Sequence, residues 1–311
     1  MEVTSDSLDE RFGRPRNHTF SRSGVRIRRF SVAGQSQSEL AALALIDAMK
    51  NANIKGDSID LLISACGVQE QALPSTACAI NAHAGLPKGT PSFDVNASCL
   101  SFLMAVKLAA TLLSVGTYRR IAVVSADQPS RGIDWSEPEA SLIFGDGAAA
   151  VILEPGNSNQ GVQSFLFKTY PEGRSLCEIR AGGTLCNPAR GASDRDYLFR
   201  MNGKKVMKLA LQNMPAFMEE LLASKGMSVE TMDLIIPHQA SHLGMAHMSK
   251  RIGVDPSRIV DIYSTHGNQV AASIPTALHE ALASGRLQPG KRALLIGTAA
   301  GLSIGGMVMD F

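Results

Sequence analysis

The chain repeats itself, and this repeat limits its possible folds more than any other feature of the sequence. An apolar helical pattern, a short turn and an apolar strand occur at residues 39–63 and again at residues 206–236. The two strands carry aspartates at matching places, Asp60 and Asp233, which are 173 positions apart. Self-similarity at a fixed spacing is the mark of a duplicated structural unit. We therefore expect two related halves.

A second pair of segments keeps nearly the same spacing. Residues 93–124 and 260–296 each read as a strand, a turn, a helix and another apolar strand. Arg120 and Arg292 precede the last strands and are 172 positions apart, and Cys99 and Asn268 in the two turns are 169 apart. We interpret Cys99 and Asn268 as equivalent positions that a pseudo-two-fold axis brings together. The expected division is an N-terminal half at 1–155, carrying the cysteine, and a C-terminal half at 156–311.

The apolar strands predict the fold class. The strands at 61–63, 121–124, 234–236 and 294–296 are short and continuously apolar, which is typical of sheets covered on both faces. They alternate with helices of ordinary length, and a final strand is expected in each half at 147–153 and 305–309. Strands and helices in this alternation indicate an α/β protein built in layers.

Composition excludes several classes of protein. The net charge is +2 with 19% charged residues, so nothing favours a nucleic-acid partner. No apolar run approaches the roughly 20 residues of a membrane helix, and the polar segment 1–16 cannot be the core of a signal peptide. The five cysteines include no CxxC pair, so we expect free thiols, a cytoplasmic location and no metal site. Cysteines other than Cys99 are expected to serve only in packing.

Cys99 is the candidate nucleophile. It follows a strand and a run of small residues and comes directly before a helical pattern, where backbone N–H groups favour a thiolate. Two later runs, 236–240 and 266–275, place His238 and Asn268 near strand ends. A cysteine, a histidine and an asparagine in such places indicate thioester chemistry.

These residues resemble the β-ketoacyl-acyl-carrier-protein synthase III branch of the thiolase superfamily. The resemblance rests on motifs that run in order from about residue 20 to the C-terminus, namely Arg22–Val25, Leu73–Cys78, Cys99 at its helix start, Phe144–Ala148, Pro237–Ala240, His266–Asn268, Ala271–Pro275 and Ala299–Gly306. It implies a thiolase-like five-layered αβαβα fold made from a duplicated half. It also implies a homodimer, a catalytic set of Cys99, His238 and Asn268, and a place for His266 beside the site.

The same resemblance implies partners and substrates. An acyl-CoA or an acyl carrier protein is expected to deliver the acyl group, and malonyl-acyl carrier protein to extend it. Leu73 falls where the family has an acyl-pocket residue near the dimer interface. An acidic carrier would dock on a basic surface, for which the candidates are Lys204, Lys208, Lys250 and Arg251.

The expected reaction has two halves. Cys99 exchanges one thioester for another, and the oxyanion of the adduct is held by the backbone N–H of Cys99 and by the loop at Ala300 and Gly301. Decarboxylation of a malonyl thioester then develops an enolate oxygen, which His238 and Asn268 stabilise as hydrogen-bond donors. The product is a 3-oxoacyl thioester of fatty-acid synthesis or of a related pathway such as pimelate formation for biotin. No cofactor is expected.

Two alternatives stay open at this level. The same cysteine serves an acyltransferase that passes the acyl group to an alcohol or amine without decarboxylation. A non-catalytic subunit that supports an active partner is the other alternative. A thiolase is disfavoured, because its second cysteine would stand in the loop that here reads Ala299–Gly301. The chain begins with the polar segment 1–16, before which the family usually has an opening strand, so either the sequence starts late or that strand is absent. Because loss of a sheet strand would expose apolar surface, we expect a late start.

Overall fold

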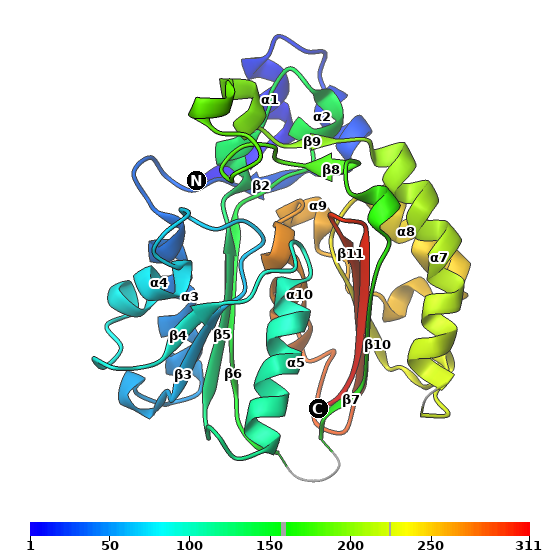
Figure 1. The fold of residues 1–311 in the computed structure, drawn as a ribbon. Helices are drawn as coiled ribbons and strands as arrows, with labels where there is room; N and C mark the ends of the chain where they lie inside the picture. The colour runs from blue at the N-terminus through cyan, green and yellow to red at the C-terminus, as the bar shows by residue number, and fades with distance from the viewer. Residues whose placement is uncertain (157–159, 224) are drawn as a thin grey trace.

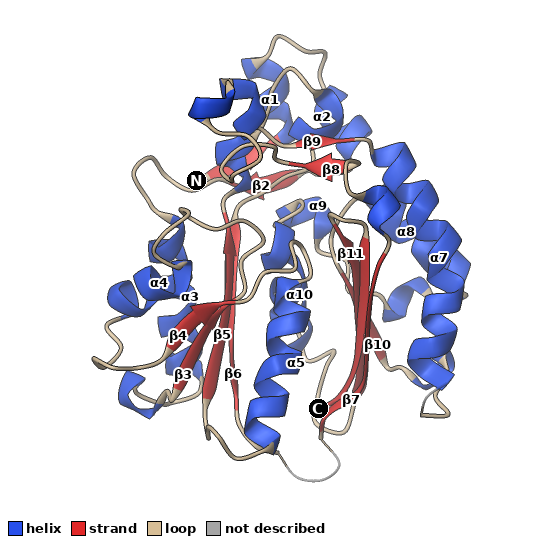
Figure 2. Cartoon of the chain, viewed as in Figure 1, coloured by secondary structure: helices blue, strands red, loops and turns tan. Residues whose placement is uncertain are grey.

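The molecule consists of two sheets with helices between them and on both outer faces. The computed structural model describes residues 1–156, 160–223 and 225–311. Figure 1 and Figure 2 show the layers side by side, with a cap of short helices and strands lying across the upper ends of both sheets. The expected α/β class and five-layered αβαβα fold are confirmed. In the described ranges no helix combines the length and apolarity that crossing a membrane requires.

The first sheet belongs to the N-terminal half and has the strand order β4-β3-β5-β6. Its strands are β3 (Leu61–Ser64), β4 (Ser92–Asp94), β5 (Ile121–Asp127) and β6 (Gly147–Leu153). β3 pairs in parallel with β4 and β5, and β6 runs antiparallel to β5. Every residue of β3 and β5 is buried, because helices cover both faces of the sheet. The outer cover is α3 (Gln37–Asn51) and α4 (Thr76–Ala84).

The second sheet belongs to the C-terminal half and has the order β10-β11-β12-β7. Its strands are β7 (Gly161–Thr169), β10 (Leu234–Pro237), β11 (Arg292–Ala299) and β12 (Ser303–Asp310). The outer face is covered by α7 (Gly203–Ala223), and α8 (His242–Ile252) packs beside α7. The strand expected at 260–262 is not formed. A 3-10 turn at Pro256–Arg258 precedes this segment and a short helix begins at Tyr263. Only an isolated bridge between Ile235 and Ile259 is formed.

The central layer holds the molecule together. It consists of α5 (Ser101–Ser114) and α10 (Ser273–Ala283), and the largest apolar cluster packs these helices against both sheets. Since each helix begins directly after one of the two candidate turns, the layer fixes where the turns lie. The division of the chain at 155/156 stays a prediction, because the cap mixes segments from both halves.

The cap is built from short elements. They are β1 (Glu2–Thr4), α1 (Ser5–Arg11), α2 (His18–Ser23), β2 (Ile27–Arg29), α6 (Pro138–Ser141), β8 (Cys177–Glu178), β9 (Arg200–Met201) and α9 (Tyr263–His266). Single 3-10 turns occur at Gly56–Ser58, Pro129–Gly132, Pro171–Gly173, Pro188–Arg190, Asp194–Tyr197, Val229–Thr231, Pro256–Arg258 and Val270–Ala272. β1 pairs with β2 in the cap. Within the described residues, β6 has no strand on its other side, whereas its counterpart β12 pairs with β7.

The turns that hold Cys99 and Asn268 share one hydrogen-bond pattern. We call residues 96–101 the Cys99 turn and residues 268–273 the Asn268 turn. Asn96 Oδ1 accepts a hydrogen bond from Ser98 N–H at 3.1 Å, and Asn268 Oδ1 accepts one from Val270 N–H at 2.9 Å. Ser98 and Val270 both have positive φ, at 51° and 54°. Asn96 is therefore the structural counterpart of Asn268.

This register corrects the pairing expected from the sequence. The fifth residue after each asparagine is a serine whose Oγ accepts a backbone N–H, at 2.9 Å for Ser101 and 3.0 Å for Ser273. The constant offset of 172 makes Ala271 the counterpart of Cys99. Pairing Cys99 with Asn268 was wrong because it matched reactive side chains, whereas the duplication preserves the backbone hydrogen bonds.

Candidate active site

Cys99 lies in its turn two residues before the first residue of α5. Leu100 is the residue that caps the helix, and the Cys99 side chain is half-buried against the central apolar cluster. The turn is closed on itself, because Ser101 Oγ also donates to Ser98 C=O at 2.7 Å. The nucleophile candidate is thus carried on a rigid turn between β4 and α5.

The surroundings of Cys99 do not favour a thiolate at rest. Burial raises the pKa of its thiol, and the nearby thiol of Cys177 and carboxyl of Asp127 act in the same direction. The backbone N–H groups of Ala300 and of Cys99 itself lie close enough to the sulfur to oppose this shift in pKa. Burial of the thiol therefore opposes the thiolate that the helix start is expected to favour. The same two N–H groups are those expected to form the oxyanion hole.

His238 follows the end of β10 and is buried, with 6% of its surface exposed. Its backbone N–H donates to Ile296 C=O at 2.8 Å, which extends the ladder between β10 and β11 by one residue. Burial lowers the pKa of the imidazole to about 4, so the ring is neutral near pH 7. Its Nδ1 has no hydrogen-bond partner within the described part of the chain.

A glycine brings His238 and the Cys99 turn together. A Cβ at Gly297 would lie 2.6 Å from the Cβ of His238 and 3.1 Å from a methyl group of Leu100. Both residues therefore pack on the bare backbone of β11. Because Leu100 is the direct neighbour of Cys99, this contact places the histidine beside the nucleophile's turn.

The Asn268 turn fixes the side chain of Asn268 through its amide oxygen and leaves the amide nitrogen free to donate. Its backbone N–H donates to Ile143 C=O at 2.8 Å, and its Oδ1 accepts from Val270 N–H. Nδ2 makes no hydrogen bond within the described residues. An oriented amide with a free N–H is what stabilisation of a developing oxyanion requires.

Two residues near Cys99 escaped the sequence analysis. Cys177 in β8 was interpreted as a packing cysteine, yet its thiol acts on the pKa of Cys99. The segment that carries it packs on the loop after Ala300, because Tyr170 and Leu302 exchange two backbone hydrogen bonds. Asp127, at the end of β5, also acts on Cys99. An acid closing a strand that is apolar apart from Ser125 is the signal that identifies Asp127.

The remaining candidate side chains that the structure describes are exposed. Leu73 is 87% exposed, so within one chain it lines no pocket. Lys204, Lys208 and Lys250 are exposed, and the side chain of Arg251 lies outside the described residues.

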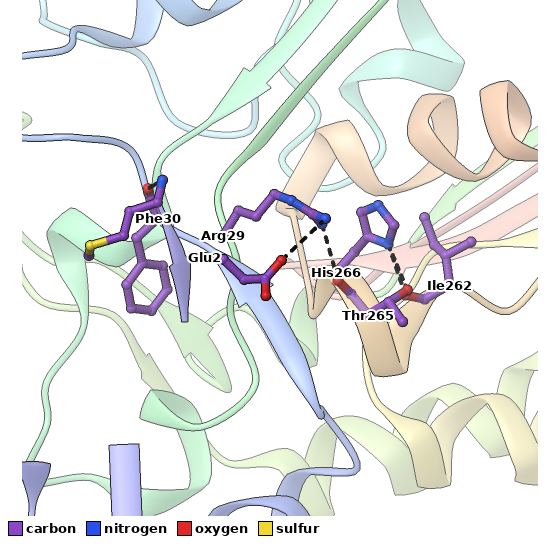
Figure 3. A network of polar contacts seen from close by, with 7 residues as sticks. Glu2, Arg29, Phe30, Ile262, Thr265 and His266 are labelled. Atoms are coloured by element: carbon purple, nitrogen blue, oxygen red, sulfur yellow. Dashed lines mark hydrogen bonds and ion pairs between the residues drawn. The ribbon is translucent and has the colours of Figure 1, made fainter. Parts of the chain in front are cut away.

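His266 belongs to a network at the border of the cap, shown in Figure 3. Its Nδ1 lies 3.3 Å from Ile262 C=O. The guanidinium of Arg29 donates to Thr265 C=O at 3.4 Å and pairs with the carboxylate of Glu2 at 3.8 Å. The ring is thus engaged in fixing α9. Its backbone lies close to the bare Cα of Gly145, where a Cβ would collide with His266 C=O. The backbone of His266 therefore packs against Gly145, just before the Asn268 turn.

Family models match residues 21–171 and 222–311 of the chain. The family model described as 3-oxoacyl-[acyl-carrier-protein (ACP)] synthase III matches residues 93–171, and the one for its C-terminal part matches residues 222–311. Residues 21–128 match the thiolase N-terminal domain. The β-ketoacyl-[acyl-carrier-protein] synthase III of Rhodospirillum rubrum is 31% identical over 309 residues, which cover 98% of this chain and 93% of that protein. The protein of the same name from Thiobacillus denitrificans is 31% identical over 290 residues, covering 93% and 89%.

A solved structure agrees. The crystal structure of 3-oxoacyl-[acyl-carrier-protein] synthase III from Aquifex aeolicus superposes with a TM-score of 0.89 at 26% identity, covering 100% of this chain and 96% of that one. The duplicated layers and a half-buried cysteine close to two backbone N–H groups define a thiolase-like protein that handles acyl groups. Within that class, the chain belongs to the β-ketoacyl-acyl-carrier-protein synthase III family.

Proposed function

We propose that this protein is a condensing enzyme that carries an acyl group on Cys99 and joins it to a malonyl unit on acyl carrier protein. The observation that carries the proposal is that the backbone N–H groups of Cys99 and Ala300 both lie near the cysteine sulfur. An acyl-enzyme needs two such donors beside its carbonyl, aimed at the oxygen that becomes negatively charged in the tetrahedral intermediate. Gly301 completes the loop and keeps it free of side-chain bulk next to the carbonyl.

The first half-reaction is a thioester exchange. The sulfur of Cys99 attacks the carbonyl of the donor thioester, the bond from carbonyl carbon to donor sulfur breaks, and the donor thiol leaves with the proton. Because the Cys99 thiol is protonated at rest, the proton must move during attack. The departing sulfur of the donor accepts it, because the donor leaves as a thiol.

The second half-reaction is a decarboxylative condensation. The malonyl thioester loses carbon dioxide, and the electron pair passes to an enolate whose oxygen accepts hydrogen bonds from His238 and from Asn268 Nδ2. The enolate carbon then attacks the acyl carbonyl, the bond from the carbonyl carbon to the Cys99 sulfur breaks, and the departing thiolate takes a proton from solvent to restore the thiol. A neutral imidazole suits this role, because it donates a hydrogen bond without a charge to be desolvated. No step requires a cofactor.

The donors and the compartment are part of the proposal. Acyl-CoA and acyl carrier protein both present the required thioester. Lys204 and Lys208 near the start of α7 and Lys250 at the end of α8 are exposed and form no ion pair within the described residues, which supports docking of an acidic carrier. The cysteines are free thiols, which supports a reducing cytoplasm.

A homodimer completes the proposal. β4 is the edge strand of the first sheet, and its Phe93 is 38% exposed. An open strand edge with an exposed aromatic residue is suited to pairing with a second copy of the same edge. Such pairing would bury Leu73 and bring it to an acyl pocket, a role it cannot have in a single chain.

Mass spectrometry of the intact protein tests the proposal. Wild-type protein incubated with acyl-CoA and acyl-carrier donors should gain one acyl group, and Cys99→Ser should gain none. Cys78→Ser is the matched control, because Cys78 is an exposed thiol on α4 and should leave labelling unchanged. If no donor labels Cys99, the assignment of the nucleophile fails.

Adding malonyl-acyl carrier protein tests the second half. The acylated enzyme should release carbon dioxide and form a 3-oxoacyl product. His238→Ala and Asn268→Ala should still acylate Cys99 but lose about 10²- to 10³-fold in product formation, as for removal of one oxyanion donor. An intact malonyl pool beside acylated alcohol or amine would establish the acyltransferase alternative instead.

A further inference from the structure

Asp127 is a buried carboxylate that the proposed chemistry does not use. It closes β5, is 2% exposed and forms no ion pair within the described residues. Burial raises the pKa of its carboxyl to about 7, while hydrogen bonds from the backbone act in the opposite direction. A buried carboxylate with no paired cation destabilises the folded state unless hydrogen bonds replace the hydration that it loses.

The hydrogen bonds of Asp127 come from both halves of the chain. Its Oδ1 accepts the N–H groups of Gly67 at 3.0 Å and Val68 at 3.1 Å, which belong to the loop after β3. Its Oδ2 accepts the N–H of Ala271 at 3.1 Å, which belongs to the Asn268 turn. The carboxylate therefore bridges segments that lie about 200 residues apart in the sequence.

On one side the bridge reaches the Cys99 turn. Asn96 donates from Nδ2 to the carbonyl of Gly67 at 3.2 Å, and its Oδ1 holds Ser98, the residue before the nucleophile. A Cβ at Gly67 would lie 3.2 Å from Asp127 Oδ1 and 3.5 Å from the carbonyl carbon of Ser98. Gly67 is thus the point where the carboxylate and the Cys99 turn meet.

On the other side the bridge reaches Asn268. Val270 is a β-branched residue at φ 54°, a conformation that persists only where its surroundings enforce it. The N–H of Val270 holds the Asn268 side chain, and the next N–H, from Ala271, is held by Asp127. A Cβ at Gly67 would also collide with the side chain of Val270, so both turns pack on this glycine.

The duplication relates the contact between Asp127 and Ala271 to the backbone of Cys99. Ala271 is the counterpart of Cys99, so its N–H is equivalent to the one that faces the cysteine sulfur. In the C-terminal half, that N–H is occupied by the carboxylate of Asp127. Only the N-terminal turn keeps its N–H for the acyl group, and the other turn is used as an anchor.

We propose that Asp127 is a positioning residue that locks the Asn268 turn against the Cys99 turn and so sets the Asn268 amide relative to the acyl-cysteine. The proposal rests on the function proposed above. Loss of the anchor should impair the condensation step, which needs both turns, more than the acylation step, which needs only Cys99 and its oxyanion N–H groups.

The test compares Asp127→Asn with Asp60→Asn in the full-length protein. Asparagine keeps the size of Asp127 but replaces one accepting oxygen with an NH2 group. Asp60 is the matched control, because its Oδ2 accepts the N–H groups of Arg119 and Arg120, at 2.8 and 2.9 Å, at the opposite end of β5. For Asp127→Asn we expect kcat for condensation to fall at least about tenfold, with the KM for the acyl donor and the extent of Cys99 acylation within about twofold of wild type. Asp60→Asn should match wild type in all three.

The possible outcomes separate the two proposals. A wild-type protein that neither acylates Cys99 nor forms a 3-oxoacyl product refutes the proposed function. Active wild type together with an equally active Asp127→Asn protein, or with equal losses in both variants, refutes the positioning role. If circular dichroism shows that Asp127→Asn does not fold, Gly67→Ala decides. This variant keeps the carboxylate but pushes Val270 away, so it should show the same selective loss, and normal condensation would overturn the proposal.

Discussion

At the scale of single residues, the site keeps its reactive groups uncharged. Burial raises the pKa of the Cys99 thiol and lowers the pKa of His238 to about 4, so near pH 7 the pair is a thiol and a neutral imidazole. A neutral thiol is a poor target for oxidants, because the thiolate is the reactive species. The cysteine is therefore protected until a thioester, oriented by the N–H groups of Cys99 and Ala300, is bound.

Alkylation of Cys99 measures this directly. The thiolate fraction rises with pH as long as pH is below the raised pKa, so the rate of labelling by iodoacetamide should increase about tenfold per pH unit from 6.5 to 8.5 without a plateau. Peptide mass spectrometry that follows Cys99 separately from the exposed Cys78 gives the rate. A plateau below pH 8 would show that the helix start dominates after all.

The close packing at Gly297 makes a second residue-level prediction. An alanine there would place its Cβ 2.6 Å from that of His238, so the strand end or the histidine must shift. Gly297→Ala should lower the free energy of unfolding by about 1–3 kcal/mol and reduce condensation. Gly183→Ala is the control, because nothing lies within 4 Å of a Cβ at that position and its φ is not positive. Equal stability and activity of both variants would contradict the placement of His238.

At the scale of elements, apolar pattern predicted most of the frame. The strand expected at 147–153 is β6 to the residue, and the helix expected at 206–222 lies within α7. The pattern failed at 260–262, where Val260, Asp261 and Ile262 form no strand and only the isolated bridge between Ile235 and Ile259 precedes them. It also misaligned Asn268 with Cys99, because the deciding hydrogen bonds involve Asn96 and Ser101, which look like ordinary turn residues in the sequence.

The sequence analysis missed Asp127 for a similar reason. Asp127 receives its partners from the loop after β3 and from a residue 144 positions away. A sequence read locally gives an acid after an apolar strand, which usually faces water at the end of a sheet. Only the packing of one half on the other makes it buried.

The capping box of α3 gives a prediction for an element remote from the site. Ser36 Oγ accepts Glu39 N–H at 3.1 Å, and the Glu39 carboxylate accepts Ser36 N–H at 2.8 Å. Ser36→Ala should lower the free energy of unfolding by about 1 kcal/mol, because one N–H at the helix start loses its acceptor. Since α3 covers the outer face of the first sheet, acylation of Cys99 should not change. Urea unfolding followed by circular dichroism checks the first claim, and a drop in acylation would contradict the second.

At the scale of the whole molecule, one chain leaves the first sheet open on both sides. β4 and β6 are its edges within the described residues, and all seven residues of β6 are half-buried, whereas the first six residues of β12 are buried. The β4 edge lies nearest to the candidate site in sequence, since the Cys99 turn begins two residues after Asp94. Pairing of this edge with a second copy would therefore couple assembly to the geometry of the nucleophile's turn.

Light scattering after size-exclusion chromatography tests this assembly. Wild type should elute at twice the chain mass of 33.0 kDa, and Phe93→Lys should shift it toward the monomer, because a charge on the strand edge opposes pairing. Val115→Lys is the control, since Val115 is exposed at the far end of α5 and should leave the dimer intact. The monomeric variant should also lose acylation of Cys99, because the turn that follows β4 is no longer held from outside. A dimer that survives Phe93→Lys, or a monomer that acylates as fast as wild type, would show that assembly does not affect the geometry of the site. Leu73 would then have no role in an acyl pocket.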